Sequence, residues 1–470
     1  MKSLPVLSDP AKAPGPLPSV LRPDGKREPI FPLDVKGRFI RWRRVTFALL
    51  IAVYLAAPLV PVGGHPAIHL DIDARKFYLL GGTFNAQDFW IVLLLATSIV
   101  FGLLFVTAWR GRLWCGWACP QTVFLEGVFR PIERLIDGPR SRRLKMLTAP
   151  WSIGRALRAL LKHTLYLLAA AAVAHVGLAL FLSASDLLTL VREGPAAAPV
   201  AFAWALAITG LLYFNFAWFR EQFCVVLCPY GRMQSVLHDK DSIVIGYDAA
   251  RGEPRGPLRK DGAGNTQGHC VDCKKCIHVC PTAIDIRNGL QMECLACAQC
   301  IDVCDEVMEK VGRPKGLIRF ASLNELAGGK RRVLRPRLVL YAALFILCFG
   351  GFTAAVAGRT PFEANVLRPP GVPWVLEGDR VRNQVEVHLV NKHSTRAAFT
   401  LRAESPIPTD VQLGAAHVEL DSLAGTRIPL VLSFARKDLA PGTDVVITIE
   451  DILSGQTRTR TLRLLAPGIR

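Results

Sequence analysis

The sequence is poor in several features that identify common protein classes. The first forty residues contain no apolar segment of the kind that forms a signal peptide, and no GxGxxG turn follows a strand. We therefore predict neither a cleavable leader nor a site for a nicotinamide or flavin nucleotide. Methionine is scarce, with five residues, and no cysteine follows Cys348. The segment after Cys348 therefore cannot be stabilised by an internal disulfide.

Apolar sequence is abundant. Hydrophobic residues make up 51% of the 470 residues, and the mean hydropathy is +0.30, which favours a membrane protein. A helix needs about 20 mostly apolar residues to cross a bilayer. Five segments come close to this length and are predicted to span it: Val45–Val62, Phe89–Trp109, Leu165–Ala184, Pro199–Phe219 and Leu338–Val356.

Positive charge is also abundant, with a formal net charge of +19. Lysine and arginine cluster beside alternate predicted helices, as the positive-inside rule describes for cytoplasmic loops. We therefore expect the N-terminus and residues 110–162 and 220–337 in the cytoplasm, and residues after Arg359 on the far side. No basic helix or RNA-binding aromatic signature accompanies the charge, so we predict no nucleic-acid partner and take the lipid bilayer as the partner.

Composition predicts a multi-domain membrane protein with an α-helical transmembrane bundle of about five helices. An inserted α+β domain, polar and rich in cysteine and glycine, separates the fourth helix from the fifth. The last segment alternates apolar and polar residues in about seven short runs, which predicts an all-β, immunoglobulin-like sandwich. The predicted regions are a disordered cytoplasmic tail (1–40), helices one to four (41–230), the inserted domain (231–336), helix five (337–358) and the periplasmic sandwich (359–470).

Eight cysteines of the inserted domain carry the most specific signal in the chain. They form two CxxCxxCxxxC runs, the pattern of bacterial ferredoxins with two clusters, in which the fourth thiolate of each run binds the other run's cluster. Zinc also uses closely spaced cysteine pairs, but it leaves the fixed third and fourth spacings unexplained. We expect two [4Fe-4S] clusters, one held by Cys270, Cys273, Cys276 and Cys304, the other by Cys294, Cys297, Cys300 and Cys280.

Two further cysteine pairs, Cys115/Cys119 and Cys224/Cys228, share the pattern CxxxCP, and each follows a predicted membrane helix. Proline suits the first position of a helix. Cys119 and Cys228 are therefore expected at helix N-caps, where the helix dipole favours the thiolate. Four thiolates brought together can hold a soft ion such as Cu(I), form redox-active disulfides, or hold a third metal site. The alternative is that they are buried packing residues.

The order of RLWCGWACP, FCVVLCPYGR, the doubled ferredoxin run and the β-rich tail resembles the cytochrome c oxidase accessory proteins of the CcoG, FixG and RdxA type. The resemblance covers nearly the whole chain after the N-terminal tail. It implies a polyferredoxin of the bacterial inner membrane that reduces Cu(II) to Cu(I) for assembly of a cbb3-type cytochrome oxidase. It further implies oxidase assembly factors and a copper-exporting P-type ATPase as partners. The copper chemistry would belong to the catalytic residues Cys115, Cys119, Cys224 and Cys228.

Two other functions stay open at this stage. One is an electron-transfer subunit of a respiratory reductase, linked to the quinol pool. The other is a redox-sensing scaffold. The electron donor is unknown, and a homo-oligomer is compatible with the sequence. His238 and His278 neighbour the cysteine motifs and are candidate hydrogen-bond partners of the metal ligands.

Overall fold

The computed structural model of the chain describes residues 29–72, 75–85, 88–258, 267–393 and 395–467. They fall into two compact units. The second unit comprises the chain from Thr353 onward together with Val62–His65 and Leu79–Asn85, and the first comprises the rest, so the cysteine-rich segment belongs to the same unit as the membrane helices.

Only part of the predicted disordered tail lies within the described residues, and that part is packed. The amide of Leu33 donates to the carbonyl oxygen of His278 at 2.8 Å. Val35 is 7% exposed and packs against Val279 and Val303. Residues 33–37 therefore lie against the cysteine-rich segment, whereas the carbonyl oxygen of Phe31 accepts from Arg140, and the sequence had predicted a disordered tail here.

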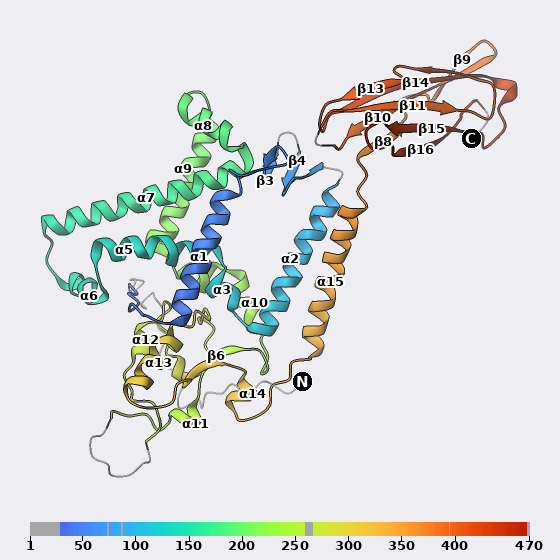
Figure 1. The fold of residues 1–470 in the computed structure, drawn as a ribbon. Helices are drawn as coiled ribbons and strands as arrows, with labels where there is room; N and C mark the ends of the chain where they lie inside the picture. Colours follow the sequence, from blue (N-terminus) through green and yellow to red (C-terminus); the bar gives the residue numbers. More distant parts are fainter. Residues whose placement is uncertain (1–28, 73–74, 86–87, 259–266, 394, 468–470) are drawn as a thin grey trace. The chain divides into compact units, whose positions relative to one another are not determined.

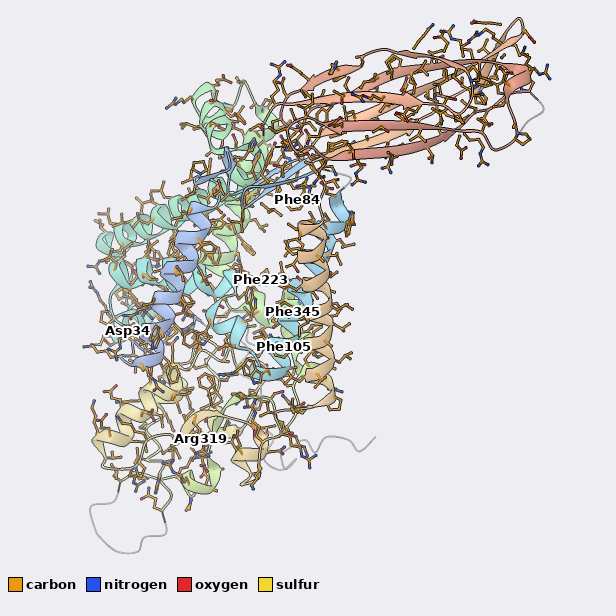
Figure 2. All side chains as sticks on the ribbon, turned by 45° about the vertical axis from the view of Figure 1, so that its right-hand side comes forward. Asp34, Phe84, Phe105, Phe223, Arg319 and Phe345 are labelled. Carbon is orange, nitrogen blue, oxygen red and sulfur yellow. The ribbon has the colours of Figure 1, made fainter. Side chains whose placement is uncertain are left out.

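Four described helices are long and apolar enough to cross a membrane, and they lie where membrane helices two to five were predicted (Figure 1). Two of them, α2 and α15, lie side by side, and a Cβ on Gly102 of α2 would be 3.2 Å from the ring of Phe345 on α15 (Figure 2). The four are α2 (Phe89–Arg110), α7 (Ile153–Leu182), α9 (Pro199–Phe214) with its π-helical continuation η4 (Asn215–Phe219), and α15 (Pro336–Ala357).

The first predicted span differs from expectation. Helix α1 comprises Arg38–Ala56, and the last two residues of the predicted span form strand β1 (Pro61–Val62). Pro58 explains the early end, because it has no backbone N–H to continue the helical hydrogen bonds. The apolar part of α1, residues 45–56, is about 18 Å long, against a hydrocarbon thickness of about 30 Å. Its polar start is partly buried, since Arg43 is fully inaccessible to solvent.

Shorter elements connect the long helices. Residues 65–85 form strands β2 (His65–Pro66), β3 (Ile68–Asp71), β4 (Lys76–Leu79) and β5 (Gly82–Asn85). The helical connections are α3 (Leu113–Trp117), α4 (Pro120–Phe124), η3 (Leu125–Phe129), α5 (Arg130–Asp137), α6 (Arg140–Thr148), α8 (Ala184–Glu193), η5 (Phe223–Leu227) and α10 (Pro229–Leu237). Three helical segments of the first unit, η3, η4 and η5, are π-helical. This geometry is rare and is frequently found at functional sites.

The cysteine-rich segment is α+β, as predicted. Strand β6 (Val244–Tyr247) pairs antiparallel with β7 (Ile318–Ala321), joining the two ends of the segment. Between them lie α11 (Ala249–Gly252), α12 (Lys275–His278), the 3-10 turn η6 (Ile286–Asn288) and α13 (Gln299–Lys310), and after them α14 (Leu323–Leu326). Ile245, Ile286, Met308 and Leu317 form the apolar core, which is completed by cysteine side chains.

The second unit contains the predicted β-sandwich. One sheet has the order β12-β14-β10-β8, with β9 also paired to β10, and the other has the order β13-β11-β15-β16. Buried and half-buried residues alternate along β15, and its buried residues Val445, Ile447 and Ile449 join one core with Phe399 and Phe434. The strands are β8 (Phe362–Leu367), β9 (Trp374–Glu377), β10 (Arg380–Asn391), β11 (Ala397–Glu404), β12 (Thr409–Leu413), β13 (His417–Leu420), β14 (Gly425–Ala435), β15 (Asp444–Asp451) and β16 (Thr457–Arg463).

Candidate metal centres

The eight cysteines of the doubled run surround two separate cavities. One cavity has an empty volume of about 370 Å³ and is lined by Cys270, Cys273, Cys276 and Cys304. The other has an empty volume of about 340 Å³ and is lined by Cys280, Cys294, Cys297 and Cys300, with Cys276 also at its edge. In each cavity the fourth cysteine of one run thus meets the first three cysteines of the other, which is the arrangement that the sequence pattern predicts.

The backbone around both cavities adopts the same unusual conformation. The second and fourth residues after the first cysteine of each run have positive φ angles: Asp272 (48°) and Lys274 (57°), and Ala296 (52°) and Ala298 (62°). None is glycine, so each of these conformations costs roughly 1–2 kcal/mol. Alternation of left- and right-handed residues turns successive N–H groups inward and forms an anion-binding concavity. Accordingly, the amide of Ala296 donates to the sulfur of Cys294.

Burial raises the pKa of most of these thiols. The pKa rises to about 12 for Cys276, Cys294 and Cys304, and to about 11 for Cys297. Such thiols ionise at neutral pH only when a cation replaces the proton, as metal binding does. Four soft sulfur ligands around each cavity fit a [4Fe-4S] cluster. Within the described residues, no three His, Cys, Asp or Glu side chains converge closely enough to hold a single metal ion.

The four CxxxCP cysteines, here called the thiol quartet, come together from two distant segments. Cys115 lies on α3, Cys224 lies in η5, and Cys119 and Cys228 precede α4 and α10. Their charges affect one another, since ionised Cys115, Cys119 and Cys228 each raise the pKa of Cys224. The two motifs therefore lie within electrostatic range of each other, although no three of the described thiols converge on one point.

The predicted helix caps are present, but the predicted lowering of the thiol pKa is wrong for Cys119. Cys119 and Cys228 are N-caps, each followed by a proline in the first turn. Burial nevertheless raises the pKa of Cys115 to about 11 and that of Cys224 to about 12. Burial also raises the pKa of Cys119, although the amides of Gln121 and Thr122 donate to its sulfur. Desolvation outweighs the helix terminus because these thiols are withdrawn from water.

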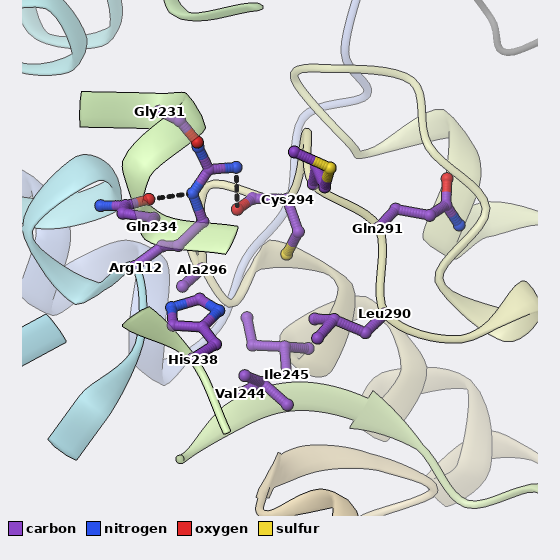
Figure 3. A pocket seen from close by; sticks show the side chains of 11 residues that line it. Arg112, Gly231, Gln234, His238, Val244, Ile245, Leu290, Gln291, Cys294 and Ala296 are labelled. Atoms are coloured by element: carbon purple, nitrogen blue, oxygen red, sulfur yellow. Dashed lines mark hydrogen bonds between the residues drawn. The ribbon is translucent and has the colours of Figure 1, made fainter. Parts of the chain in front are cut away.

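Arg112 connects the thiol quartet to the loop of the second cluster cavity (Figure 3). Its Nε donates to Oε1 of Gln234, and its terminal nitrogens donate to the carbonyl oxygens of Gly231 (2.9 Å) and Cys294 (3.4 Å). Gln234 in turn donates to the sulfur of Cys115 at 3.3 Å. A continuous chain of polar contacts therefore runs from Cys115 to the backbone of Cys294.

Helix α3 packs directly on the same loop. A Cβ on Gly116 would lie 2.4 Å from the carbonyl oxygen of Leu295, so only glycine fits there without displacement. The indole nitrogen of Trp117 donates to the carbonyl oxygen of Ala296 at 3.3 Å, across 179 residues of sequence. Arg43 of α1 donates to the carbonyl oxygen of Gly116 at 2.9 Å. Helix α3 is thus held between α1 and the cluster loop.

A pocket with an empty volume of about 630 Å³ lies beside this contact (Figure 3). Its apolar lining includes Val244, Ile245 and Leu290, and its polar lining includes Arg112 and His238. Nε2 of His238 is buried and has no hydrogen-bond partner in the described part of the chain. Burial, and then the charge of Arg112, lower the pKa of His238 to about 4, so the imidazole is neutral at pH 7.

A buried ionic network precedes the second CxxxCP motif and was not predicted. Arg130 pairs with Glu126 at 2.6 Å and with Glu221, and Arg220 donates to Glu133 at 3.1 Å. All five side chains are at most 8% exposed. Breaking one such pair costs about 3–5 kcal/mol, because a buried charge is left unmatched. The network thereby fixes the chain just before Cys224. The sequence did carry a signal for this network: Glu126 and Glu133 lie among the arginines of residues 110–162, a loop that we had explained by the positive-inside rule alone.

Comparison with protein families assigns three parts of the chain. The family described as "4Fe-4S dicluster domain" matches residues 219–323, and the one described as "4Fe-4S binding domain" matches residues 90–140, which include Cys115 and Cys119. The family described as an IG-like fold at the C-terminal of FixG matches residues 352–467. The iron–sulfur and immunoglobulin-like assignments made from the sequence are thereby confirmed.

Curated relatives match over most of their length. Protein RdxB of Cereibacter sphaeroides is 33% identical over 92% of this chain and 94% of its own. The nitrogen fixation protein FixG of Rhizobium meliloti is 33% identical over 81% and 80%, and protein RdxA of Cereibacter sphaeroides is 34% identical over 85% and 84%. A crystal structure of a FixG-related protein from Vibrio parahaemolyticus matches 23% of this chain and 99% of its own, with 16% identity and a TM-score of 0.20.

Proposed function

Because this chain belongs to the FixG/RdxA family of membrane-bound 4Fe-4S electron-transfer proteins, we propose that it reduces Cu(II) to Cu(I) at the thiol quartet, one electron per ion, for assembly of a cbb3-type cytochrome c oxidase. Two [4Fe-4S] clusters, when bound, store and supply the electrons. The ligands would be Cys270, Cys273, Cys276 and Cys304 for one cluster, and Cys280, Cys294, Cys297 and Cys300 for the other.

The contact between the quartet and the Cys294 loop is the observation that carries this proposal. Gln234 and Arg112 bridge the sulfur of Cys115 and the backbone of Cys294, and α3 packs on Leu295 without an intervening side chain at Gly116. Electrons held at the second cavity would have a short path through packed protein to the quartet. Such a path is what delivery of electrons to copper requires.

The chemistry of the quartet suits copper as a substrate. Thiolates are soft ligands that favour Cu(I) over harder ions, so they would retain the reduced product. The raised pKa values of Cys115, Cys119 and Cys224 mean that copper has to displace protons, and copper binding would therefore release protons. Iron–sulfur potentials span about −700 to +450 mV, so clusters in the lower part of that range make reduction of Cu(II) favourable.

The proposal also includes an orientation and partners. The distribution of basic residues supports a cytoplasmic position for the quartet and the cluster segment, and a periplasmic position for the β-sandwich, in a bacterial inner membrane. The sandwich would then offer a docking surface to oxidase assembly factors. A copper-exporting P-type ATPase would be a neighbour in the same pathway.

A second candidate function is electron transfer from the quinol pool to a respiratory reductase. The pocket beside Cys294 favours it, because apolar walls and the unpartnered Nε2 of His238 suit an apolar ring that offers a hydroxyl or carbonyl group. In that case rapid cluster reduction by a quinol, without cluster oxidation by Cu(II), is the expected behaviour.

The copper proposal is tested by mixing the reduced protein anaerobically with Cu(II) and trapping the product with a Cu(I)-specific chelator. We expect about two equivalents of Cu(I), one for each of two clusters. The double variant Cys119→Ala with Cys228→Ala should lose this yield while keeping its iron. A full yield from the double variant would refute the quartet as the copper site.

Iron analysis distinguishes copper from a third iron–sulfur cluster as the occupant of the quartet. Two clusters correspond to about eight irons for each chain. The match of residues 90–140 to a 4Fe-4S binding family makes a third cluster the competing occupant of the quartet. About twelve irons, falling to eight in the double variant, would establish that occupant in place of copper.

A further inference from the structure

A second large pocket lies near the start of α7, away from the cysteine sites. Its empty volume is about 850 Å³. Five cationic side chains line this basic pocket, against the two carboxylates of Glu133 and Asp137. The cationic residues are Arg143, Arg155, Arg158, Lys162 and Arg220. The surplus of positive charge requires an anion that the described residues of the pocket do not provide.

Arg143 is the residue that most needs such an anion. It is 3% exposed, and its Nε and one terminal nitrogen have no hydrogen-bond partner in the described part of the chain. Within the described residues its ion pair is with Glu133, at 3.8 Å, a carboxylate that is also bound by Arg220 at 3.1 Å. A buried donor without an acceptor costs about 1–3 kcal/mol, and more when it is charged. A ligand oxygen would remove that cost.

The pocket lies at the polar start of α7, before the apolar part of that helix. Helix α7 has 30 residues, or about 45 Å of helix, whereas the hydrocarbon core is about 30 Å thick. In an upright crossing about ten residues would extend beyond the hydrocarbon, and Arg155, Arg158 and Lys162 all lie in the first ten residues of α7. The polar end of α7 thus reaches the headgroup layer.

The rim of the pocket is apolar and exposed. Trp151 is 76% exposed and Leu147 is 52% exposed, and both line the pocket. Ile153, at the start of α7, is 86% exposed. Tryptophan is enriched at membrane interfaces, where its ring lies among the headgroups. A ligand with a phosphate and acyl chains satisfies both the basic floor and the apolar rim.

We propose that the basic pocket binds the headgroup of an anionic phospholipid, whose phosphate accepts hydrogen bonds from Arg143. Basic pockets beside membrane helices recognise such headgroups by this chemistry. The N-terminal tail is a poor alternative occupant, because its first 28 residues carry five Lys or Arg against three Asp or Glu. The proposal is independent of the copper chemistry, since none of the cysteines lines this pocket.

The test uses the full-length, iron-loaded protein, delipidated in neutral detergent and examined by native mass spectrometry. Phosphatidylglycerol and phosphatidylcholine with identical chains are added separately. We expect phosphatidylglycerol to bind at one site with an affinity at least about tenfold higher than phosphatidylcholine. Equal binding of the two lipids would overturn the proposal. Displacement by inorganic phosphate at the lipid's own concentration would assign the site to soluble phosphate and would overturn it as well.

Arg142 provides a matched control, because it adjoins Arg143 but is exposed. Arg143→Gln should weaken phosphatidylglycerol binding about tenfold, the loss of one charged hydrogen bond, whereas Arg142→Gln should not change it. Arg158→Gln lowers the charge of the pocket without removing a buried ion pair, and it should also weaken binding if Arg143→Gln fails to fold. Unchanged binding in Arg158→Gln and in any folded Arg143→Gln would contradict the assignment.

Discussion

Arg112 is the side chain on which communication between the cysteine sites depends most directly. It is 8% exposed, and its guanidinium contacts Gln234, Gly231 and Cys294. Arg110, two residues earlier, is exposed and stacks on the ring of Trp109. The two arginines, similar in sequence, therefore have different roles.

We expect Arg112→Gln to slow copper reduction at least about tenfold, or 1.4 kcal/mol of activation free energy. The reason is that Gln234, Gly231 and Cys294 would each lose a charged donor, and the quartet would move relative to the Cys294 loop. The measurement is the anaerobic rate of Cu(I) formation, with iron content as a check. Arg110→Gln is the control and should react at the wild-type rate. Equal rates in both variants would argue against the bridging role.

Single residues also show the limits of prediction from sequence. The N-cap positions of Cys119 and Cys228 were predictable, because CxxxCP with proline at the first helical position is a local pattern. The pKa values of the thiols were not predictable, since they depend on burial by distant segments. The network of Arg130 and Glu221 was missed for the same reason, because its partners lie 91 residues apart.

Helix α3 is a short element whose packing decides where the quartet lies. Gly116 faces the carbonyl oxygen of Leu295 at a distance that excludes a Cβ. Gly154, near the start of α7, has nothing within 4 Å of a Cβ position. The two glycines make a matched pair, one at a closed contact and one in open space.

We expect Gly116→Ala to separate α3 from the Cys294 loop and to reduce both the yield of Cu(I) and the iron content. Gly154→Ala should retain both, and it should stabilise the protein by about 0.5–1 kcal/mol, because alanine favours the helix over glycine. Iron analysis and thermal unfolding of the two variants test this. Normal activity in Gly116→Ala would show that the close approach is dispensable.

Among the elements, those with long apolar runs were predicted best. The helices α2, α9 and α15 lie at the expected places, and α7 overlaps its predicted span but begins at Ile153 instead of Leu165, because a run of about 20 apolar residues has few other stable structures. The end of α1 was mispredicted, because the hydrophobic run continues through Pro58, which lacks the N–H that a continuing helix needs. The π segments η3, η4 and η5 carry no sequence pattern that could have revealed them.

At the level of the whole chain, contacts made by the start of α1 and by the end of α2 argue that α1 also crosses the membrane. The amide of Ile40 near the start of α1 donates to Asp302 at 2.9 Å, and the carbonyl oxygen of Trp109 near the end of α2 accepts from Ile243 at 3.2 Å. Both contacts are to the segment that carries the cluster cavities. If α2 crosses the membrane, α1 has to cross it as well.

Five crossings place the two termini on opposite sides of the membrane, whereas four would place them on the same side. We expect a fluorescent protein fused to the N-terminus to be fluorescent, and alkaline phosphatase fused to the C-terminus to be active, because the first folds in the cytoplasm and the second requires the periplasm. The reverse fusions serve as controls. Termini on one side would contradict the crossing of α1.

The central claim is that two motifs more than a hundred residues apart form one thiol site beside the iron–sulfur segment. Disulfide mapping tests it most directly. The iron-loaded protein, freed of copper by a Cu(I) chelator, is oxidised mildly with diamide without oxygen, and its linked peptides are identified by mass spectrometry. We predict disulfides that join Cys115 or Cys119 to Cys224 or Cys228, with the iron retained. Disulfides confined within each CxxxCP motif would contradict the claim.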